Sequence, residues 1–306
     1  MNSILNNSAA LSALQALNMT QQALATVQNQ VSTGLSVATA SDNAAYWSIA
    51  TQLNADSTMV SASNSALSQS QAVLDSGNTA ISSIITTINS IQAALTEATN
   101  PGAALADINT TLASLGQQLT DAITGASFNG TNVLDGSSIA GSNTSVSFVS
   151  GFDAGTNNVT TISMGLTALY TANTGGGAGT GVLGQATGTT SIAGTYDLTL
   201  LGSSASGGTQ VTAANAQDIL TAVDAALSSV TNYAAQIGAT QDRMSSMSNL
   251  NMALTTNYAN GIQGLVDADM NVASTRLQAL QTQEQLGIQS LSIANQNAQL
   301  ILKLFP

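Results

Sequence analysis

The side chains that most enzymes use for nucleophilic and metal chemistry are missing from this sequence, which contains no His and no Cys. Ser-His-Asp and Cys-His sites are therefore excluded, and so are typical zinc sites, which need imidazole or thiolate ligands. Acid–base chemistry would fall to the fifteen Asp and Glu residues, to Lys303 or to the tyrosines. Because the carboxylates are spread along the chain without a paired spacing, we predict no catalytic residue and no enzymatic activity.

Two short patterns resemble ligand-binding motifs but lack features that those motifs require. Residues 179–184 have the G-x-G-x-x-G spacing of a dinucleotide-binding loop, but the segment that follows them does not open a helix. The run that starts at Asp267 resembles a calcium-binding loop. Its sixth position is Val272 instead of Gly, and its twelfth is Gln278 instead of Glu. We therefore expect no cofactor and no metal ion at either place.

The chain is acidic and poor in charge, with a formal net charge of −12 and only three Lys and Arg residues. Binding to nucleic acid or to an anionic membrane surface requires clustered cations, which three scattered ones cannot supply. The longest apolar runs fall short of the roughly 20 residues that a membrane span needs. The N-terminus lacks the pattern of a cleaved secretory signal. This fits a cytoplasmic protein, or one exported by a machine that reads an uncleaved N-terminus, with no nucleic-acid and no membrane partner.

Apolar residues recur at seven-residue spacing near both ends of the chain, which is typical of long helices that pack against one another. The stripe over 46–95 predicts a helix over about 43–98 that would be roughly 80 Å long. A matching stripe spans 223–244, and a last one near the C-terminus is interrupted by Glu284 and Gly287. Long helices at both ends predict that the two termini of the chain pack together.

The terminal helices carry little apolar mass, because small and amide side chains flank their stripes. An intramolecular bundle is a sufficient interpretation for residues 81–95. For the terminal segments, stabilisation by neighbouring molecules is favoured, which indicates a protein that self-assembles. The residues that we expect to pack in the assembly are Leu17, Leu24, Val31, Leu53, Val60, Leu67, Leu74, Met270, Leu277, Leu280, Leu291 and Ile301.

The middle of the chain, from about 126 to 211, is dominated by Gly, Ser, Thr and Asn. Short alternating runs in it, such as 159–164 and 196–200, predict short strands separated by turns. The predicted fold is therefore mainly α: a long-helix, coiled-coil-like bundle built from both termini, with a small β-rich domain inserted in the middle. Its low apolar content predicts that the insertion contacts mainly itself and can be removed without loss of assembly.

Four stretches resemble the bacterial flagellin family. They are TGLSVATASDNAAYWSIATQL at 33–53, SFNGTNVLDG at 127–136, IGATQDRMS at 237–245, and DADMNVASTRLQALQTQEQLGIQSLSIANQNAQLILKLF at 267–305. Together they place the resemblance over roughly 1–136 and 213–306, in the family's order. The sequence departs from the family's pattern where Ser36 and Ser41 replace basic residues and where Tyr46 replaces a common Gly.

The resemblance implies a structural subunit that polymerises into the helical bacterial flagellar filament used for motility. It implies a filament-core α-domain from 1–42 and 260–306, and a rod-like α-domain from 43–138 and 212–259. Residues 139–211 would form a surface-exposed, β-rich variable insertion. No catalytic residue, cofactor or metal ion is implied.

The same resemblance implies the partners and the location of the protein. The subunit would be secreted by the flagellar type III export apparatus and would reside in the extracellular filament. Its partners would be further copies of itself in a homo-oligomeric filament, a flagellin export chaperone, a filament cap protein and the hook–filament junction proteins.

The resemblance also implies an altered site for the vertebrate Toll-like receptor that senses flagellin. In flagellins that are sensed, Arg and Glu side chains on the long N-terminal helix make the main polar contacts, just before an Ala-Thr-Asn turn. Here that turn is residues 98–100, Gln92 and Ala93 stand where the Arg and Glu are expected, and Leu95 lies on the same segment. An Arg donates two parallel, charge-assisted hydrogen bonds to a carboxylate, which Gln cannot do. We therefore expect poor recognition by this receptor.

Two other interpretations stay open from the sequence. The hook–filament junction protein shares the terminal helices but builds only a short collar, so filament formation by the purified chain would distinguish it. The middle domain could also be a carbohydrate-binding or adhesive module, for which Phe148, Tyr170 and Tyr196 are the candidate stacking residues.

Overall fold

The computed structural model describes residues 7–135, 145–170, 181–184, 186–187, 195–203 and 208–304, with the side chains of the last helix described as far as residue 296. In this part of the chain the structure is mainly α, which confirms the predicted fold class. The helices are α1 Ser8–Thr33, α2 Ala44–Ala98, α3 Leu105–Gly125, α4 Ala216–Val266 and α5 Met270–Leu304. The strands are β1 Ser145–Asp153, β2 Asn158–Gly165, β3 Ala186–Thr187 and β4 Thr195–Tyr196.

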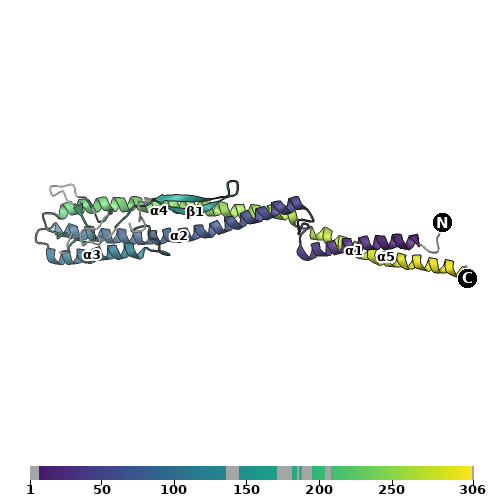
Figure 1. Cartoon of the computed structure of the whole chain (residues 1–306). Coiled ribbons are helices and arrows are strands. Elements are labelled where there is room, and N and C mark those ends of the chain that lie inside the picture. The colour runs from purple at the N-terminus through teal and green to yellow at the C-terminus, as the bar shows by residue number, and fades with distance from the viewer. Residues whose placement is uncertain are drawn as a thin grey trace. The chain divides into compact units, whose positions relative to one another are not determined.

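The chain divides into two compact units. Unit 1 contains Met1–Thr58 and Thr255–Pro306, and unit 2 contains Met59–Leu254. The long helices α2 and α4 contribute residues to both units. Within unit 1, α1 and α5 lie side by side (Figure 1), as predicted for helices from opposite ends of the chain.

Helix α1 of unit 1 is capped at both ends, by a polar side chain at its start and by a glycine in the left-handed conformation at its end. The side-chain oxygen of Asn7 accepts a hydrogen bond from the backbone N–H of Ala10 at 3.1 Å, which satisfies a free donor of the first turn of α1. Gly34 ends α1 with φ of 75°, and its N–H donates to the carbonyl of Gln30 at 2.9 Å. That left-handed conformation is accessible to Gly without steric cost.

The segment after α1 is fixed to the end of α4 by main-chain hydrogen bonds. The N–H of Ser36 donates to the carbonyl of Val266 at 2.7 Å, and the N–H of Ala268 donates to the carbonyl of Gly34 at 2.8 Å. Val37, Ala50 and Val266 form a small buried cluster beside these bonds. The two halves of the sequence are therefore joined in unit 1 by backbone pairing as well as by helix packing.

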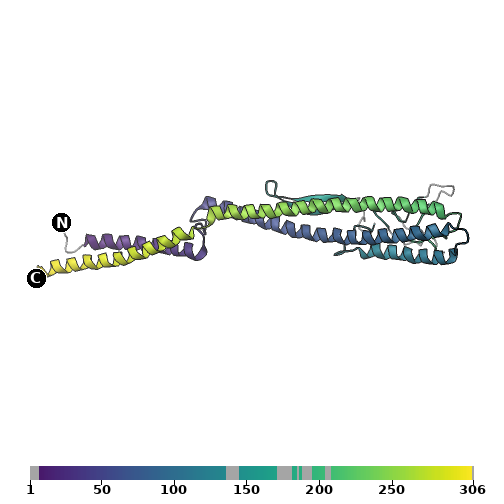
Figure 2. The same ribbon diagram turned by 180° about the vertical axis from the view of Figure 1, so that it is seen from behind.

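Unit 2 has the larger hydrophobic core, in which α2, α3 and α4 run alongside one another (Figure 2). The predicted heptad of α2 is buried from Val60 onward, and residues at every seventh position up to Leu95 are at most 1% exposed. On α4, Val223, Val230 and Ile237 are fully buried at the same spacing. The seven-residue pattern thus places one face of each long helix in a shared core.

The described part of the middle segment packs into this core, so the expectation that it contacts mainly itself is wrong. Leu169, Leu183, Leu198 and Leu201 are fully buried and belong to the same cluster as the helices. The backbone at Thr199 approaches α3 closely at Gly116, which has no side chain. A methyl group added there would lie 2.8 Å from the carbonyl carbon of Thr199.

Paired hydrogen bonds add to the contact between the middle segment and the helices. The Asn109 side chain on α3 donates to the carbonyl of Val211 at 3.0 Å and accepts from the N–H of Val211 at 2.8 Å. The antiparallel β1–β2 hairpin has an irregularity between Val149 and Gly151, where the Asn251 side chain of α4 donates to the Ser150 carbonyl at 2.9 Å. Since buried polar groups are satisfied by these bonds, the segment is an integral part of unit 2.

Candidate assembly surfaces

The pair of helices α1 and α5 is a candidate for assembly between copies, because the sequence patterns predicted assembly through the terminal helices. The two residues that interrupt the predicted stripe of α5 both take part in this contact. Leu17 of α1 packs over Gly287, where an added methyl group would lie 3.2 Å from the Leu17 Cδ1 atom. The Gln21 amide donates to the Glu284 carboxylate at 3.3 Å. Gly287 and Glu284 thus both take part in the contact between α1 and α5.

Among the described side chains of α1 and α5, the polar contacts between the two helices are made by amide donors. Besides the bond from Gln21 to Glu284, the Asn7 side chain donates to the Ala294 carbonyl at 3.0 Å. These two bonds lie far apart along α1, so together they set the register of the two helices. A neutral donor is consistent with a chain in which only 6% of residues are charged, against about 25% in an average protein.

The residues predicted to pack in the assembly lie in three different environments. Val60, Leu67 and Leu74 are 0% exposed within unit 2, so they stabilise the subunit and cannot reach a neighbouring copy. Leu67 and Leu74 belong to the core cluster of that unit. Met270 is 45% exposed. The side chain of Ile301 lies outside the described residues. The others are partly buried in unit 1: Leu17, Leu24, Val31, Leu53, Leu277, Leu280 and Leu291.

Exposed large apolar side chains gather in unit 1, where the sequence stripes did not identify most of them. They occur on the two terminal helices and at the start of α2. Single exposed apolar residues are ordinary on a protein surface, whereas clusters of them mark interaction sites. The residues in unit 1 with large apolar side chains that are at least 39% exposed are Leu11, Leu14, Met19, Tyr46, Trp47, Ile49, Met270, Val272, Leu286, Ile288 and Ile293.

The segment proposed as an altered receptor site lies on α2 in unit 2. Gln92 is partly buried and donates a hydrogen bond to the Asp224 carboxylate of α4, and Ala93 is exposed. Leu95 is 0% exposed and belongs to the core cluster. The side chains of Gln92 and Ala93 are therefore the ones available to a binding partner, whereas Leu95 supports the helix from inside.

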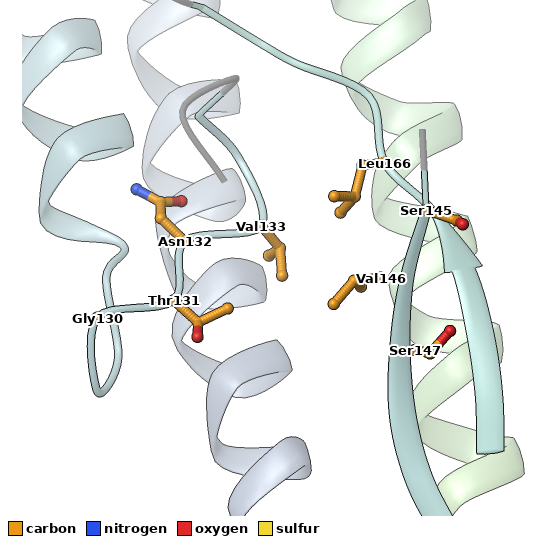
Figure 3. Close-up of a pocket in the computed structure, with 8 residues that line it drawn as sticks. All are labelled: Gly130, Thr131, Asn132, Val133, Ser145, Val146, Ser147 and Leu166. Atoms are coloured by element: carbon orange, nitrogen blue, oxygen red, sulfur yellow. The ribbon is translucent and has the colours of Figure 1, made fainter. Parts of the chain in front are cut away.

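The aromatic residues considered for an adhesive module are occupied by the core of unit 2. Phe148 and Tyr196 are each 6% exposed, and Tyr170 is partly buried against the same cluster. Figure 3 shows a nearby cavity of about 610 Å³ between β1 and the turn after α3. The residues that line it in the described structure include no aromatic and no charged side chain: Gly130, Thr131, Asn132, Val133, Ser145, Val146, Ser147 and Leu166. Base or sugar stacking therefore has no exposed platform among these residues.

Two buried tyrosines of unit 2 donate hydrogen bonds to groups in the protein. The Tyr196 hydroxyl donates to the Asp218 carboxylate at 2.6 Å, and the Tyr233 hydroxyl donates to the Val133 carbonyl at 2.6 Å. Burial, together with the hydrogen bond to Asp218 and its negative charge, raises the pKa of Tyr196 to about 12. Burial raises the pKa of Tyr233 to about 12. Both phenols are thus harder to ionise in the folded state than in the unfolded chain, where the pKa is about 10.

We therefore expect unit 2 to lose stability in alkaline solution. A tyrosine with a raised pKa contributes stability that is fully present below pH 10 and is lost as the pH rises towards 12. Thermal unfolding followed by circular dichroism should show a melting temperature that falls steeply over this interval. Tyr196→Phe should make the fall shallower, while Tyr46→Phe, at a residue that is 48% exposed, should leave it unchanged. If the melting temperature fell equally steeply with pH in the wild type and in both variants, Tyr196 would not be a source of the alkaline instability.

None of the described helices contains an apolar stretch long enough to span a membrane. Within the same residues, Asp and Glu side chains do not gather in groups of three that could hold a metal ion.

Comparison with known proteins identifies relatives over the whole chain. The sequence model of the bacterial flagellin N-terminal helical region matches residues 4–139, and that of the bacterial flagellin C-terminal helical region matches residues 220–305. Flagellin C of Rhizobium meliloti (strain 1021) is 37% identical over 321 residues, which cover 100% of this chain and 99% of that protein. Flagellin of Brucella melitensis biotype 1 is 35% identical, with 100% of this chain and 99% of that protein covered. Flagellin FljO of Caulobacter vibrioides is 32% identical with the same coverage.

Proposed function

Since this chain belongs to the bacterial flagellin family and is a structural subunit of the flagellar filament, we propose a division of labour among its parts. Residues 1–42 and 260–306 form the filament core, and residues 43–138 and 212–259 form a rod that makes lateral contacts. Residues 139–211 form a β-rich segment that packs on the rod through its buried leucines and faces outward on its other side. The observation that supports this division best is the concentration of exposed apolar side chains on the terminal helices of unit 1.

Burial of these side chains between copies is the driving force that we propose for assembly. Each large apolar side chain removed from water contributes about 1.5–3 kcal/mol when it is fully buried. The filament core repeats the same contact at every subunit, so a modest contribution per copy is multiplied along the polymer. The protein is a component of the extracellular flagellar filament.

We further propose that the subunit reaches the filament through the flagellar type III export apparatus. An export chaperone would hold the exposed faces of the terminal helices before export, a cap protein would guide folding at the filament tip, and hook–filament junction proteins would form its base. The support is chemical: apolar faces such as that of Leu11 and Leu14 on α1 require cover in any state that precedes assembly.

Electron microscopy of the purified protein after salt-induced polymerisation tests the proposed assembly. Salt screens the repulsion between subunits that each carry a net charge of −12 and strengthens apolar burial, so it should promote polymerisation. Long helical filaments are the expected product. Short collars that stop growing would indicate a junction protein, and a persistent monomer would contradict the proposed roles of the terminal helices.

We also propose that this filament protein is a poor agonist of the vertebrate flagellin-sensing Toll-like receptor. The supporting observation is that Gln92 already donates a hydrogen bond to Asp224 and that the neighbouring surface position is Ala93. Neither side chain supplies a charge. Loss of a charged anchor at the centre of an interface typically costs about 2 kcal/mol or more, which is roughly thirtyfold in affinity.

A reporter-cell assay that compares the wild-type monomer with Gln92→Arg plus Ala93→Glu tests this proposal. We expect the double variant to signal at concentrations about thirtyfold lower than the wild type. The matched control is Gln241→Arg, which also places an Arg beside a carboxylate, since Gln241 donates to Asp75 at 2.7 Å elsewhere in unit 2. Wild-type signalling at the potency of a known agonist flagellin would refute the proposal.

A further inference from the structure

One of the two Asn-Gly pairs in this sequence lies in a tight, exposed turn of unit 2. The pairs are Asn129-Gly130 and Asn260-Gly261. The first pair follows α3, and Figure 3 shows Gly130 in the loop after that helix. Asn129 and Gly130 are both exposed and have φ of 49° and 77°. Left-handed φ values at both central positions are typical of the two-residue turn for which Asn-Gly is the preferred sequence.

The hydrogen bonds that close this turn leave out the backbone nitrogen of Gly130. The N–H of Phe128 donates to the carbonyl of Thr131 at 2.9 Å, and the N–H of Thr131 donates to the carbonyl of Phe128 at 2.9 Å. Gly130 has no side chain that would hinder an approach to its nitrogen. Exposed turns open locally at a small cost in free energy. When this turn opens, the Gly130 nitrogen can therefore reach the side-chain carbon Cγ of Asn129.

The other Asn-Gly pair is held in a helix, where the same approach is blocked. Asn260 is also exposed, but it lies with Gly261 inside α4. Each N–H inside an α-helix donates to the carbonyl four residues earlier, so the Gly261 nitrogen is engaged and is held away from the Asn260 side chain. The reaction there requires local unwinding of the helix. The two pairs thus share their chemistry and their exposure but differ in backbone conformation.

We propose that Asn129 is a site of spontaneous deamidation. The Gly130 nitrogen loses its proton to a base in solution and attacks Cγ of Asn129. A new C–N bond forms and the bond from Cγ to Nδ2 breaks, so ammonia leaves and a five-membered succinimide remains. Water then opens the succinimide at either of its two carbonyls, which gives an aspartyl or an isoaspartyl residue. The net change is the loss of ammonia and the gain of water, and it needs no oxidant and no cofactor.

The isoaspartyl product disturbs the end of α3. Its main chain runs through the side-chain carbons, which adds one backbone atom to a turn that is closed by two hydrogen bonds. Just beyond the turn, the buried Asn132 side chain donates to the Ile123 carbonyl at 2.6 Å and accepts from the N–H of Leu134 at 2.8 Å. A longer turn displaces Asn132 from the last turn of α3. Deamidation at Asn129 therefore lowers the stability of unit 2, and this effect is independent of filament assembly.

The test follows both Asn-Gly pairs in the full-length protein during incubation in mildly alkaline buffer. The buffer water is enriched in the heavy oxygen isotope, so a residue that deamidates during the incubation takes up a heavy oxygen that tandem mass spectrometry of peptides locates. In the folded protein we expect Asn129 to react about tenfold faster than Asn260, or more. In urea the two rates should come within about threefold of each other, because neither backbone is held. A folded protein in which Asn129 reacts no faster than Asn260 would overturn the proposal.

The variant Asn129→Gly tests the effect on stability. Gly-Gly also forms this turn and has no side-chain amide to lose. Complete reaction at Asn129 should lower the melting temperature of unit 2 in the wild type by about 3 °C or more. The same incubation should leave the melting temperature of Asn129→Gly unchanged. A deamidated wild type that melts at its original temperature would overturn the inferred effect on α3. An equal fall in Asn129→Gly would overturn it as well, because the loss would then come from another residue.

Discussion

A chain that lacks residues 1–35 or residues 266–306 should remain a soluble, helical monomer and should form no filaments. The larger hydrophobic cluster lies within unit 2, Met59–Leu254, and includes no residue of either deleted segment. Its helices should therefore stay folded without the terminal segments. Each deletion removes α1 or α5, and with it the helix pair and the exposed apolar side chains that we assign to the filament core.

Circular dichroism, sedimentation and electron microscopy measure the three parts of this expectation. The far-ultraviolet spectrum should keep a strong helical signal, and the sedimentation coefficient should be that of a monomer at salt concentrations that polymerise the full chain. Long filaments from either truncated protein would show that the terminal helices are not the core.

Replacing residues 140–205 with a short Gly-Ser bridge should strongly destabilise unit 2. The replacement removes Leu169, Leu183, Leu198 and Leu201, each of which is fully buried in the cluster shared with α2, α3 and α4. Loss of a single buried Leu side chain typically costs about 2–5 kcal/mol. We expect the melting temperature of unit 2 to fall by at least about 15 °C, since about 1 kcal/mol corresponds to about 2–4 °C for a domain of this size.

A single substitution tests the same packing without deleting a segment. Gly116→Ala should be destabilising by about 1–3 kcal/mol, because the added methyl group meets the Thr199 backbone. Gly238→Ala on α4 is the matched control, since nothing lies within 4 Å of a methyl group there. Helix propensity alone predicts that both changes stabilise by about 0.5–1 kcal/mol. In thermal or denaturant unfolding, only Gly238→Ala should be more stable than the wild type. Equal stabilisation by both substitutions would mean that the middle segment does not pack on α3.

The sequence by itself determined the helices and the family. The heptads of α2 and α4 predicted long helices with one buried face, and the burial from Val60 to Leu95 follows that pattern. Gly34 ends α1 in the left-handed conformation, which a residue without a side chain adopts most readily. Absence of His and Cys excluded whole classes of chemistry. The helix prediction was confirmed because apolar periodicity acts locally along the chain.

The tertiary structure decided which segment of the chain covers each apolar helix face. Leu67 and Leu277 occupy similar stripes, yet the first is fully buried in unit 2 and the second is partly buried in unit 1. The sequence did not predict the burial of Leu198 either, because the helices that share its core are far away in sequence. The seven-residue spacing of apolar side chains shows that a helix has an apolar face, but it does not identify the segment that packs on that face. The answer depends on contacts between segments that are distant in sequence.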